Sequence, residues 1–164
     1  DLLERAWAVG RVDAVQPKLN LIHRDAADVL AWCASHDVRA IVYSPMASGL
    51  LTGAFSVQRA AALGADDWRR AHPDFTGAAL ARNLELVEAL RTIAVRHGVS
   101  VAAVAVAWTL AFDAVAGAIV GLRRPDQVRG WLTAAGLRLD EADLTEIAAA
   151  VERTGAGSGP ARPT

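Results

Sequence analysis

Two segments of the sequence combine glycine with small or basic residues in a way that suits an anion. Residues 44–53 are mostly small, so their backbone can approach a ligand closely and offer N–H groups to phosphate oxygens. In the second segment, Gly121, Arg123 and Gln127 surround the expected start of a helix, where unpaired N–H groups favour an anion. Arg123 and its neighbour Arg124 could pair bidentately with a phosphate, with a solvated arginine pair as the alternative.

Gln16 and Tyr43 each stand at the end of a short segment that is expected to be a strand. The Gln16 side chain carries a donor and an acceptor, so it could pair with a carboxamide or cap loop backbone. The Tyr43 ring could support a flat ligand or simply pack against protein. From the residues alone, a binding role and a structural role stay open at both positions.

These residues must be positioned by short strands that alternate with helices. Strands are expected at residues 12–16, 39–43 and 118–121. The capping residues Asp25, Ser100 and Asp140 each precede a helical pattern. Helices are expected at residues 2–9, 25–36, 81–97, 100–112, 125–135 and 140–153, with a long irregular excursion at 46–80 and a disordered, glycine- and proline-rich tail at 154–164.

The alternation predicts an α/β fold with a parallel sheet, because parallel neighbours need crossover connections that helices provide. Three strands make a poor independent sheet, since both outer strands offer unpaired N–H and C=O groups to solvent or to another chain. We therefore expect that part of the fold is missing, and that the open sheet edges allow self-association.

Composition excludes several classes of protein. Seventeen basic and eighteen acidic residues give a formal charge of −1, so neither a nucleic acid nor a membrane surface is expected as a partner. The single cysteine, Cys33, excludes an internal disulfide framework and a CxxC zinc site, which fits a reducing cytoplasm. The first residues carry acids among apolar residues and no basic segment, so we do not expect a signal peptide there. The apolar stretch 101–120 is interrupted by Asp113 and Gly117, which favours a buried helix, turn and strand over a membrane span.

Three stretches of the sequence, residues 15–24, 42–53 and 120–128, resemble the aldo-keto reductase family in their order and separation. Trp108 lies in a helix similar to the one that precedes the last barrel strand of that family. The resemblance spans roughly residues 3–152 and implies a partial TIM (β/α)8 barrel over residues 1–153. This part would supply strands six, seven and eight, with the ligand site at the carboxyl ends of the strands. The missing strands one to five would precede this chain.

The resemblance also implies a nicotinamide-dinucleotide site. The family places an aromatic ring against the nicotinamide at the position of Tyr43, and Gln16 would hold the nicotinamide amide. Arg123 would meet the ribose 2′-phosphate, which favours NADP over NAD. The completed protein would pass hydride from NADPH to a small-molecule aldehyde or ketone. The implied cofactor-binding residues are Gln16, Tyr43, Ser44, Pro45, Met46, Gly49, Gly121, Arg123 and Gln127.

The sequence departs from the family pattern at two parts of this site. A lysine–aromatic pair expected after residues 52–53 is replaced by Ala54 and Phe55, which removes a positive contact to the pyrophosphate. A glutamate–asparagine pair near the adenine corresponds to Gly130 and Trp131, which cannot make those polar contacts.

The catalytic aspartate, tyrosine, lysine and histidine of the family all come from the earlier half of the barrel. Tyr43 is the only tyrosine and Lys18 the only lysine of this chain, so no proton-donor pair is expected and the chain alone should be inactive. The four histidines are expected to be surface or capping residues. A non-catalytic nucleotide-binding or regulatory subunit of the same superfamily is the alternative function.

Overall fold

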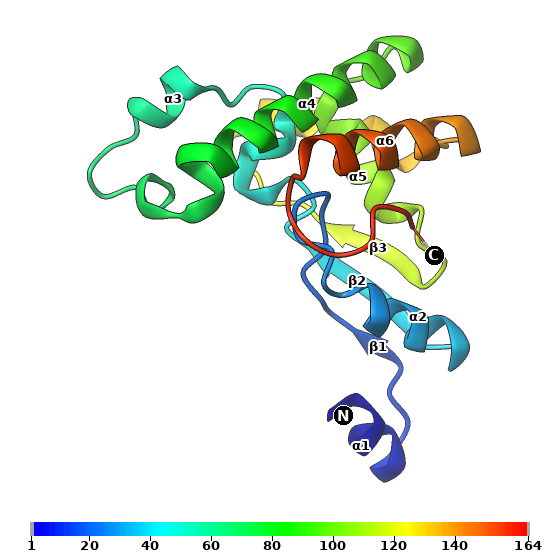
Figure 1. Cartoon of the computed structure of the whole chain (residues 1–164). Helices are drawn as coiled ribbons and strands as arrows, with labels where there is room; N and C mark the ends of the chain where they lie inside the picture. The colour runs from blue at the N-terminus through cyan, green and yellow to red at the C-terminus, as the bar shows by residue number, and fades with distance from the viewer. Residues whose placement is uncertain (1, 164) are drawn as a thin grey trace.

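The protein is built on a three-stranded parallel sheet, seen in a computed structural model that describes residues 2–163 (Figure 1). Strand β2 (Arg39–Tyr43) lies in the centre, between β1 (Ala14–Val15) and β3 (Val115–Ile119). Helices lie between successive strands, as parallel pairing requires. The predicted α/β fold with parallel strands is confirmed.

The two faces of the sheet differ in what covers them. In β2, Ala40 and Val42 are fully buried, whereas Ile41 and Tyr43 are 40% and 41% exposed. Ile119, which pairs with Tyr43, is also 46% exposed. Because successive side chains of a strand point to opposite faces, the described helices pack against one face and leave the other open.

Strand β3 begins earlier than the sequence predicts. The prediction placed this strand at residues 118–121, but its pairing with β2 runs over Val115–Ile119. Gly117 and the neighbouring alanines have low strand propensity, which concealed the first half of the strand. Val120 and Gly121 therefore lie beyond the paired residues, in the turn that follows.

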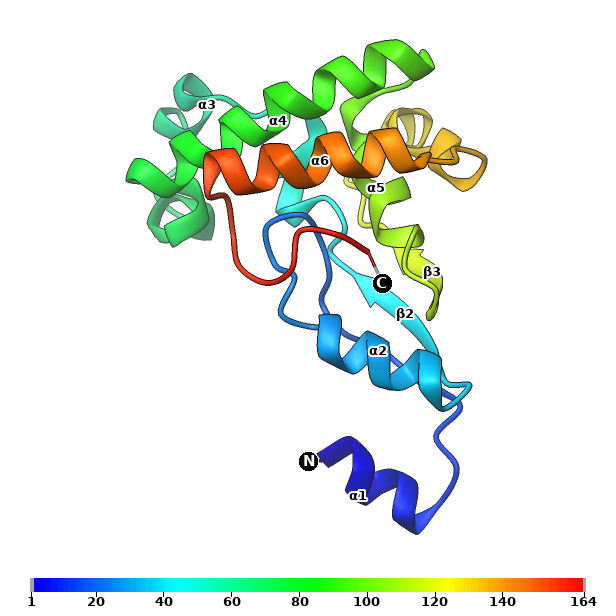
Figure 2. The same cartoon turned by 45° about the vertical axis from the view of Figure 1, so that its right-hand side comes forward.

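Three helices pack together into an apolar layer that meets the sheet at β3. The long helix α4 (Gly77–His97) lies beside α6 (Glu141–Thr154), as Figures 1 and 2 both show. Helix α5 (Val101–Leu110) runs beneath them, and every residue of it except Leu110 is buried. The core therefore centres on α5, as its almost wholly apolar sequence predicts.

The predicted caps Ser100 and Asp140 are confirmed: their side chains accept backbone N–H groups three residues on, at 3.0 and 2.8 Å. The first turn of α6 also carries the buried Asp143, whose carboxylate binds Arg96 and His97 at 2.7 Å each. Burial alone would raise the pKa of Asp143, but hydrogen bonds from His97, the Asp140 N–H and Arg96 hold it below its ordinary value. This charge cluster joins α6 to the end of α4.

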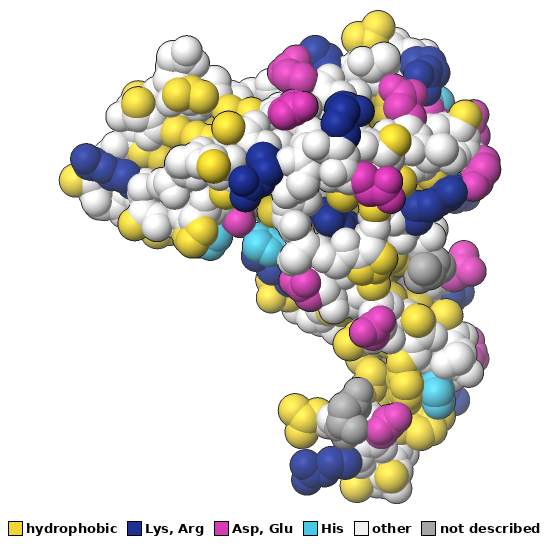
Figure 3. All heavy atoms as spheres, in the orientation of Figure 1, with side chains coloured by type: hydrophobic (Ala, Val, Ile, Leu, Met, Phe, Trp, Pro, Cys, Tyr) yellow, Lys and Arg dark blue, Asp and Glu magenta, His cyan; other side chains and the backbone are white. Residues whose placement is uncertain are grey.

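Helices α1 (Leu2–Val9) and α2 (Ala27–Ser35) form the narrow end of the molecule (Figures 1 and 3). No residue of α1 is buried. Aromatic rings join the two helices: Trp7 meets Trp32 edge to face with centroids 5.7 Å apart, and Trp32 stacks on His36 at 4.0 Å. The α1 surface is thus one of the least covered parts of the described chain.

The excursion between β2 and α4 consists of short turns rather than a long regular element. It contains α3 (Val57–Ala61) and three 3-10 turns at residues 47–52, 68–71 and 73–75. The Phe55 and Phe75 rings hold it together, edge to face at 5.1 Å. Helix α4 then starts four residues before the predicted position.

The C-terminal segment follows a defined path, where the sequence predicted disorder. Ser158 N donates to Ile22 O at 3.0 Å, and Arg24 N donates to Ser158 O at 3.1 Å. Gly157 has a φ of 66°, and a Cβ there would overlap the Ile22 carbonyl, so only glycine allows this contact. Asp25 does not cap α2 as predicted, because it accepts from Ser158 Oγ at 2.9 Å instead.

Residues 2–163 contain no single helix that is long and apolar enough to span a membrane. Only α4 and α5 together reach that length and composition, across a bend of 92°. The same residues include no group of three or more His, Cys, Asp or Glu side chains placed to hold a metal ion. Cys33 is buried and free, and burial raises the pKa of its thiol.

Candidate functional site

The carboxyl ends of the three strands bring the predicted residues to one edge of the sheet. Gln16 follows β1, Tyr43 is the last residue of β2, and Gly121 lies two residues beyond β3. Tyr43 N donates to Pro17 O at 3.1 Å, and Leu19 N donates to Tyr43 O at 3.2 Å. Because Tyr43 also pairs with β3, it occupies the middle of this edge and is held from both sides.

Tyr43 and Gln16 both present accessible side chains. The Tyr43 ring lies on the open face of the sheet, and Gln16 is exposed, with no hydrogen bond from its side chain to any described residue. An exposed aromatic ring and an unpaired amide at the ends of two neighbouring strands suit a flat heteroaromatic ligand that carries a carboxamide.

The backbone turns sharply after Tyr43 through several left-handed residues. Ser44, Ala47 and Ser48 have φ values of 58°, 46° and 54°, and Gly49 follows with 96°. Each such conformation costs a non-glycine residue about 1 kcal/mol or more, so the turn persists only where its surroundings fix it. Turns that mix right- and left-handed residues form concavities of N–H groups that bind anions.

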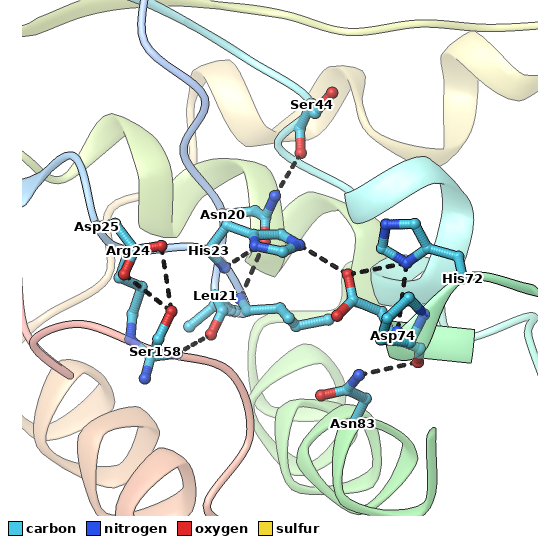
Figure 4. Close-up of polar contacts among 12 residues, drawn as sticks. Asn20, Leu21, His23, Arg24, Asp25, Ser44, His72, Asp74, Asn83 and Ser158 are labelled. Carbon is cyan, nitrogen blue, oxygen red and sulfur yellow. Dashed lines mark hydrogen bonds and ion pairs between the residues drawn. The ribbon is translucent and has the colours of Figure 1, made fainter. Parts of the chain in front are cut away.

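Asn20 fixes this turn through its buried side chain (Figure 4). Its Nδ2 donates to Ser44 O at 2.9 Å, and its Oδ1 accepts from Ile22 N and His23 N, also at 2.9 Å. Ala47 N donates to the same Ser44 carbonyl at 3.0 Å. Nothing in the sequence singled out Asn20, because a bond that spans 24 positions leaves no local pattern. Its one signal is the general preference of asparagine for turns.

The rest of the turn rests on the core except at Ser48, which is exposed, and Gly49, which is half-buried. Because Pro45 is buried, it can offer a ligand only its backbone. The half-buried Met46 packs against the small side chains of α5. Thr52 Oγ1 donates to Gly49 O at 2.7 Å. A Cβ on Gly49 would meet no atom within 4 Å, which leaves room for a ligand beside this backbone.

The turn after β3 is exposed and differs from the predicted helix start. Two 3-10 segments, Pro125–Gly130 and Leu132–Ala135, replace the helix expected at residues 125–135. Gln127 Oε1 accepts from Arg123 N at 2.7 Å and from Arg124 N at 3.2 Å, so Gln127 shapes the turn.

The two arginines of this turn differ in their partners. Arg124 pairs with Asp126 at 3.2 Å. The exposed Arg123 guanidinium forms no ion pair with the described residues, which leaves it available to an anion.

The excursion reaches back to both turns through a charged pair. Arg69 Nη2 lies 2.6 Å from Asp67 Oδ2, and the hydrogen bond from Arg69 lowers the pKa of Asp67 to about 2, with a smaller contribution from the charge of Arg123. Arg69 Nη1 also donates to Ser48 O at 3.4 Å. The sequence shows this charge cluster at residues 66–70, but no pattern assigns it a partner.

Gly130 and Trp131, the two positions that depart from the family pattern near the adenine, are partly buried. Trp131 packs against small residues of α5, and its buried Nε1 has no hydrogen-bond partner in the described structure. The Gly130 carbonyl accepts from Ser100 Oγ. This end of the site therefore provides packing rather than polar side chains.

The histidines make structural contacts. His97 binds Asp143, and His23 Nε2 lies 2.7 Å from Asp74 Oδ2. His72 Nδ1 accepts from Asp74 N at 3.3 Å (Figure 4). A polar cleft of about 240 Å³ borders the His23–Asp74 pair and the C-terminal segment.

The model of the Aldo/keto reductase family matches residues 2–152. The chain therefore belongs to this family, and the resemblance seen in its sequence is confirmed. The structure of the glycerol dehydrogenase AKR11B4 from Gluconobacter oxydans superposes with a TM-score of 0.84 at 28% identity. That comparison covers 99% of this chain and 48% of the other, so the fold is part of a TIM barrel.

Curated relatives show the same relation in length. The Aldo-keto reductase yakc (NADP(+)) of Schizosaccharomyces pombe is 29% identical over 149 residues, which cover 88% of this chain and 43% of that protein. The NADH-specific methylglyoxal reductase of Escherichia coli is 27% identical over 148 residues, which cover 88% and 44%. The chain thus spans less than half the length of the curated relatives it matches.

Proposed function

We propose that this chain supplies the nucleotide-binding part of an NADP-dependent aldo-keto reductase, which in its complete form reduces a small aldehyde or ketone to an alcohol. The observation that carries this proposal is the exposed Tyr43 ring at the central strand end, followed by a left-handed turn that the buried Asn20 holds. When bound, the cofactor supplies the hydride. The residues of this chain bind and orient it.

The residues present fit such a ligand. Tyr43 would stack on the nicotinamide, and Gln16 would bind its amide through the free side chain. The turn at residues 44–49 and the open backbone at Gly121 would receive the phosphates, because neither crowds an approaching group.

The preference for NADP rests on Arg123. Members of the family use nicotinamide cofactors, but one relative above is named for NADP(+) and another for NADH, so membership does not decide between them. The 2′-phosphate adds negative charge where Arg123 is exposed and has no ion-pair partner among the described residues. We therefore favour NADPH over NADH.

The isolated chain is proposed to lack reductase activity. A backbone bridge pairs Lys18 with Tyr43, yet no hydrogen bond joins their side chains in the described part of the structure. The Tyr43 hydroxyl therefore lacks the partner that would activate it as a proton donor. In this proposal the donor belongs to the other half of the barrel.

Paired substitutions at Tyr43 test this role. If the ring stacks on nicotinamide, Tyr43→Phe should bind NADPH within twofold of the parent, whereas Tyr43→Ala should weaken binding roughly five- to tenfold. Tryptophan fluorescence titration measures both. Reduction of an aldehyde by the purified chain, lost in Tyr43→Phe, would instead make Tyr43 a proton donor and contradict the proposal.

The open sheet is the proposed route of self-association. Within residues 2–163 both outer strands have an unpaired edge, and Ile41 and Ile119 are exposed on the open face, which favours pairing with another chain. Sedimentation velocity should show a concentration-dependent dimer or larger species. A single monomeric species at all concentrations would refute the proposed self-association. A reducing cytoplasm remains the proposed location, supported by the free Cys33.

A further inference from the structure

A continuous set of buried and part-buried polar contacts joins the C-terminal segment to the turn after Tyr43 (Figure 4). Arg24, only 3% exposed, donates from Nε to Gly159 O and from Nη1 to Ala156 O, both at 3.1 Å, and also to Leu21 O. A single guanidinium therefore holds the carbonyls of two separate segments, residues 21–24 and 156–159.

Glycine makes this contact possible at two positions. A Cβ on Gly157 would overlap the backbone of Ile22, and one on Gly159 would overlap the backbone of Arg24. Both glycines have positive φ values, 66° and 89°. The C-terminal segment thus fits the 20–24 turn closely, and a methyl group at either position must displace it.

The 20–24 turn ends at Asn20, which is the link to the site. The Asn20 Oδ1 holds the turn itself through two N–H groups, while its Nδ2 reaches across to the Ser44 carbonyl. Ser44 has a left-handed backbone that a serine does not prefer, so this donor helps to keep an unfavourable conformation in place. If the 20–24 turn relaxes, the donor moves away from Ser44.

We propose that Asn20 is a positioning residue for the nucleotide-binding turn at residues 44–49, and that the C-terminal segment acts on this turn through Arg24 and Asn20. The inference rests on the proposed nucleotide role of the turn. A turn held in its binding conformation avoids an ordering cost when the ligand binds. Displacing the C-terminal segment should therefore loosen a turn to which it forms no hydrogen bond in the described structure.

Amide hydrogen exchange of the 164-residue chain tests the coupling without a ligand. Gly157→Ala displaces the C-terminal segment, and Asn20→Asp can keep the two acceptor bonds while losing the donor to Ser44. Gly136→Ala is the matched control, since a Cβ there meets no atom within 4 Å. Protection of the Ala47 amide, which shares the Ser44 carbonyl, should fall about tenfold in both test variants and stay unchanged in the control.

A second readout separates positioning from general destabilisation. The Val99 amide, bonded to Ala94 O at the end of α4, should keep its protection in both test variants. Unchanged Ala47 protection in Gly157→Ala, or an equal loss at Ala47 and Val99, would overturn the inference. If Asn20→Asp does not fold, the result for Gly157→Ala alone decides whether the two segments are coupled. If Gly157→Ala does not fold either, a chain that ends at residue 155 takes its place in the measurement.

NADPH titration of the same proteins distinguishes a failure of the positioning role from a failure of the proposed nucleotide-binding function. Binding by the parent that weakens about tenfold in both test variants supports the positioning role. Equal affinity in parent and variants, despite lost Ala47 protection, overturns it. Absence of binding in the parent contradicts the proposed function and with it the nucleotide part of this inference, while the exchange data still decide whether the two segments are coupled.

Discussion

The turns that follow β2 and β3 lie at the same edge of the sheet but are built differently. The turn after Tyr43 has left-handed residues held by the buried Asn20. The turn after β3 is exposed, and Gln127 stabilises it through bonds to its own neighbours. A buried, long-range bond fixes one backbone shape, whereas local bonds at the surface leave a charged side chain such as Arg123 free to adapt. In the proposed nucleotide site, the turn after Tyr43 would therefore be rigid and the turn that carries Arg123 would be adaptable.

The largest predicted difference between the two turns is in stability. Asn20→Ala should lower the free energy of unfolding by about 3 kcal/mol, because the buried N–H of Ile22 and the part-buried N–H of His23 lose their partner. Urea denaturation measures the change. The control Asn83→Ala removes a buried asparagine with one bond, to Asp74 O, and should cost about half as much. Equal losses of stability in the two variants would show that the additional hydrogen bonds of Asn20 do not stabilise the chain.

Arg123→Ala probes the adaptable turn through affinity. Loss of a charged hydrogen bond to the 2′-phosphate should weaken NADPH binding about tenfold and leave NADH binding unchanged. Arg124→Ala removes the same charge from a residue already paired with Asp126, so it should change NADPH affinity by less than threefold. If both substitutions weaken NADPH binding equally in fluorescence titration, Arg123 contributes only its positive charge and no specific contact with the 2′-phosphate.

Gln127→Ala should destabilise the chain by only about 1 kcal/mol, because the N–H groups it caps are exposed and can bind water instead. Urea denaturation of Gln127→Ala and Asn20→Ala compares the two losses of stability directly. Gln58 is exposed, so Gln58→Ala is a control that should change the free energy of unfolding by about zero. A loss as large as that of Asn20→Ala would mean that the two turns are equally fixed.

The smallest effect concerns the pH dependence of the Asp67–Arg69 pair. The pKa of Asp67 in the folded chain, about 2, lies below its ordinary value of 3.8. Its contribution to stability is therefore present above about pH 4 and is lost as the pH falls toward 2. The stability difference between the parent and Asp67→Asn should shrink over this window. A constant difference for Asp67→Asn in acid titrations would refute the pair as the cause.

Local patterns predicted much of the fold. Strand β2 was predicted at residues 39–43 and is found there, and the caps Ser100 and Asp140 bond as expected. The start of β3 was missed because its pairing with β2, rather than its own residues, defines it.

Features that depend on distant contacts could not be predicted in this way. Glycines in the C-terminal segment suggested disorder, yet Gly157 serves close packing against Ile22. In the proposed site, strand ends and family motifs pointed to Gln16 and Tyr43, and their binding roles stay predictions. The bond from Asn20 to Ser44 links positions far apart in the sequence and became visible only in three dimensions.

Titration of the 164-residue chain with NADPH and NADH, followed by tryptophan fluorescence and confirmed by calorimetry, tests the central claim most directly. The account predicts saturable binding of NADPH, tighter than that of NADH, with the difference removed in Arg123→Ala. No saturable response to either nucleotide would contradict the claim that this chain carries a nucleotide-binding site of its own.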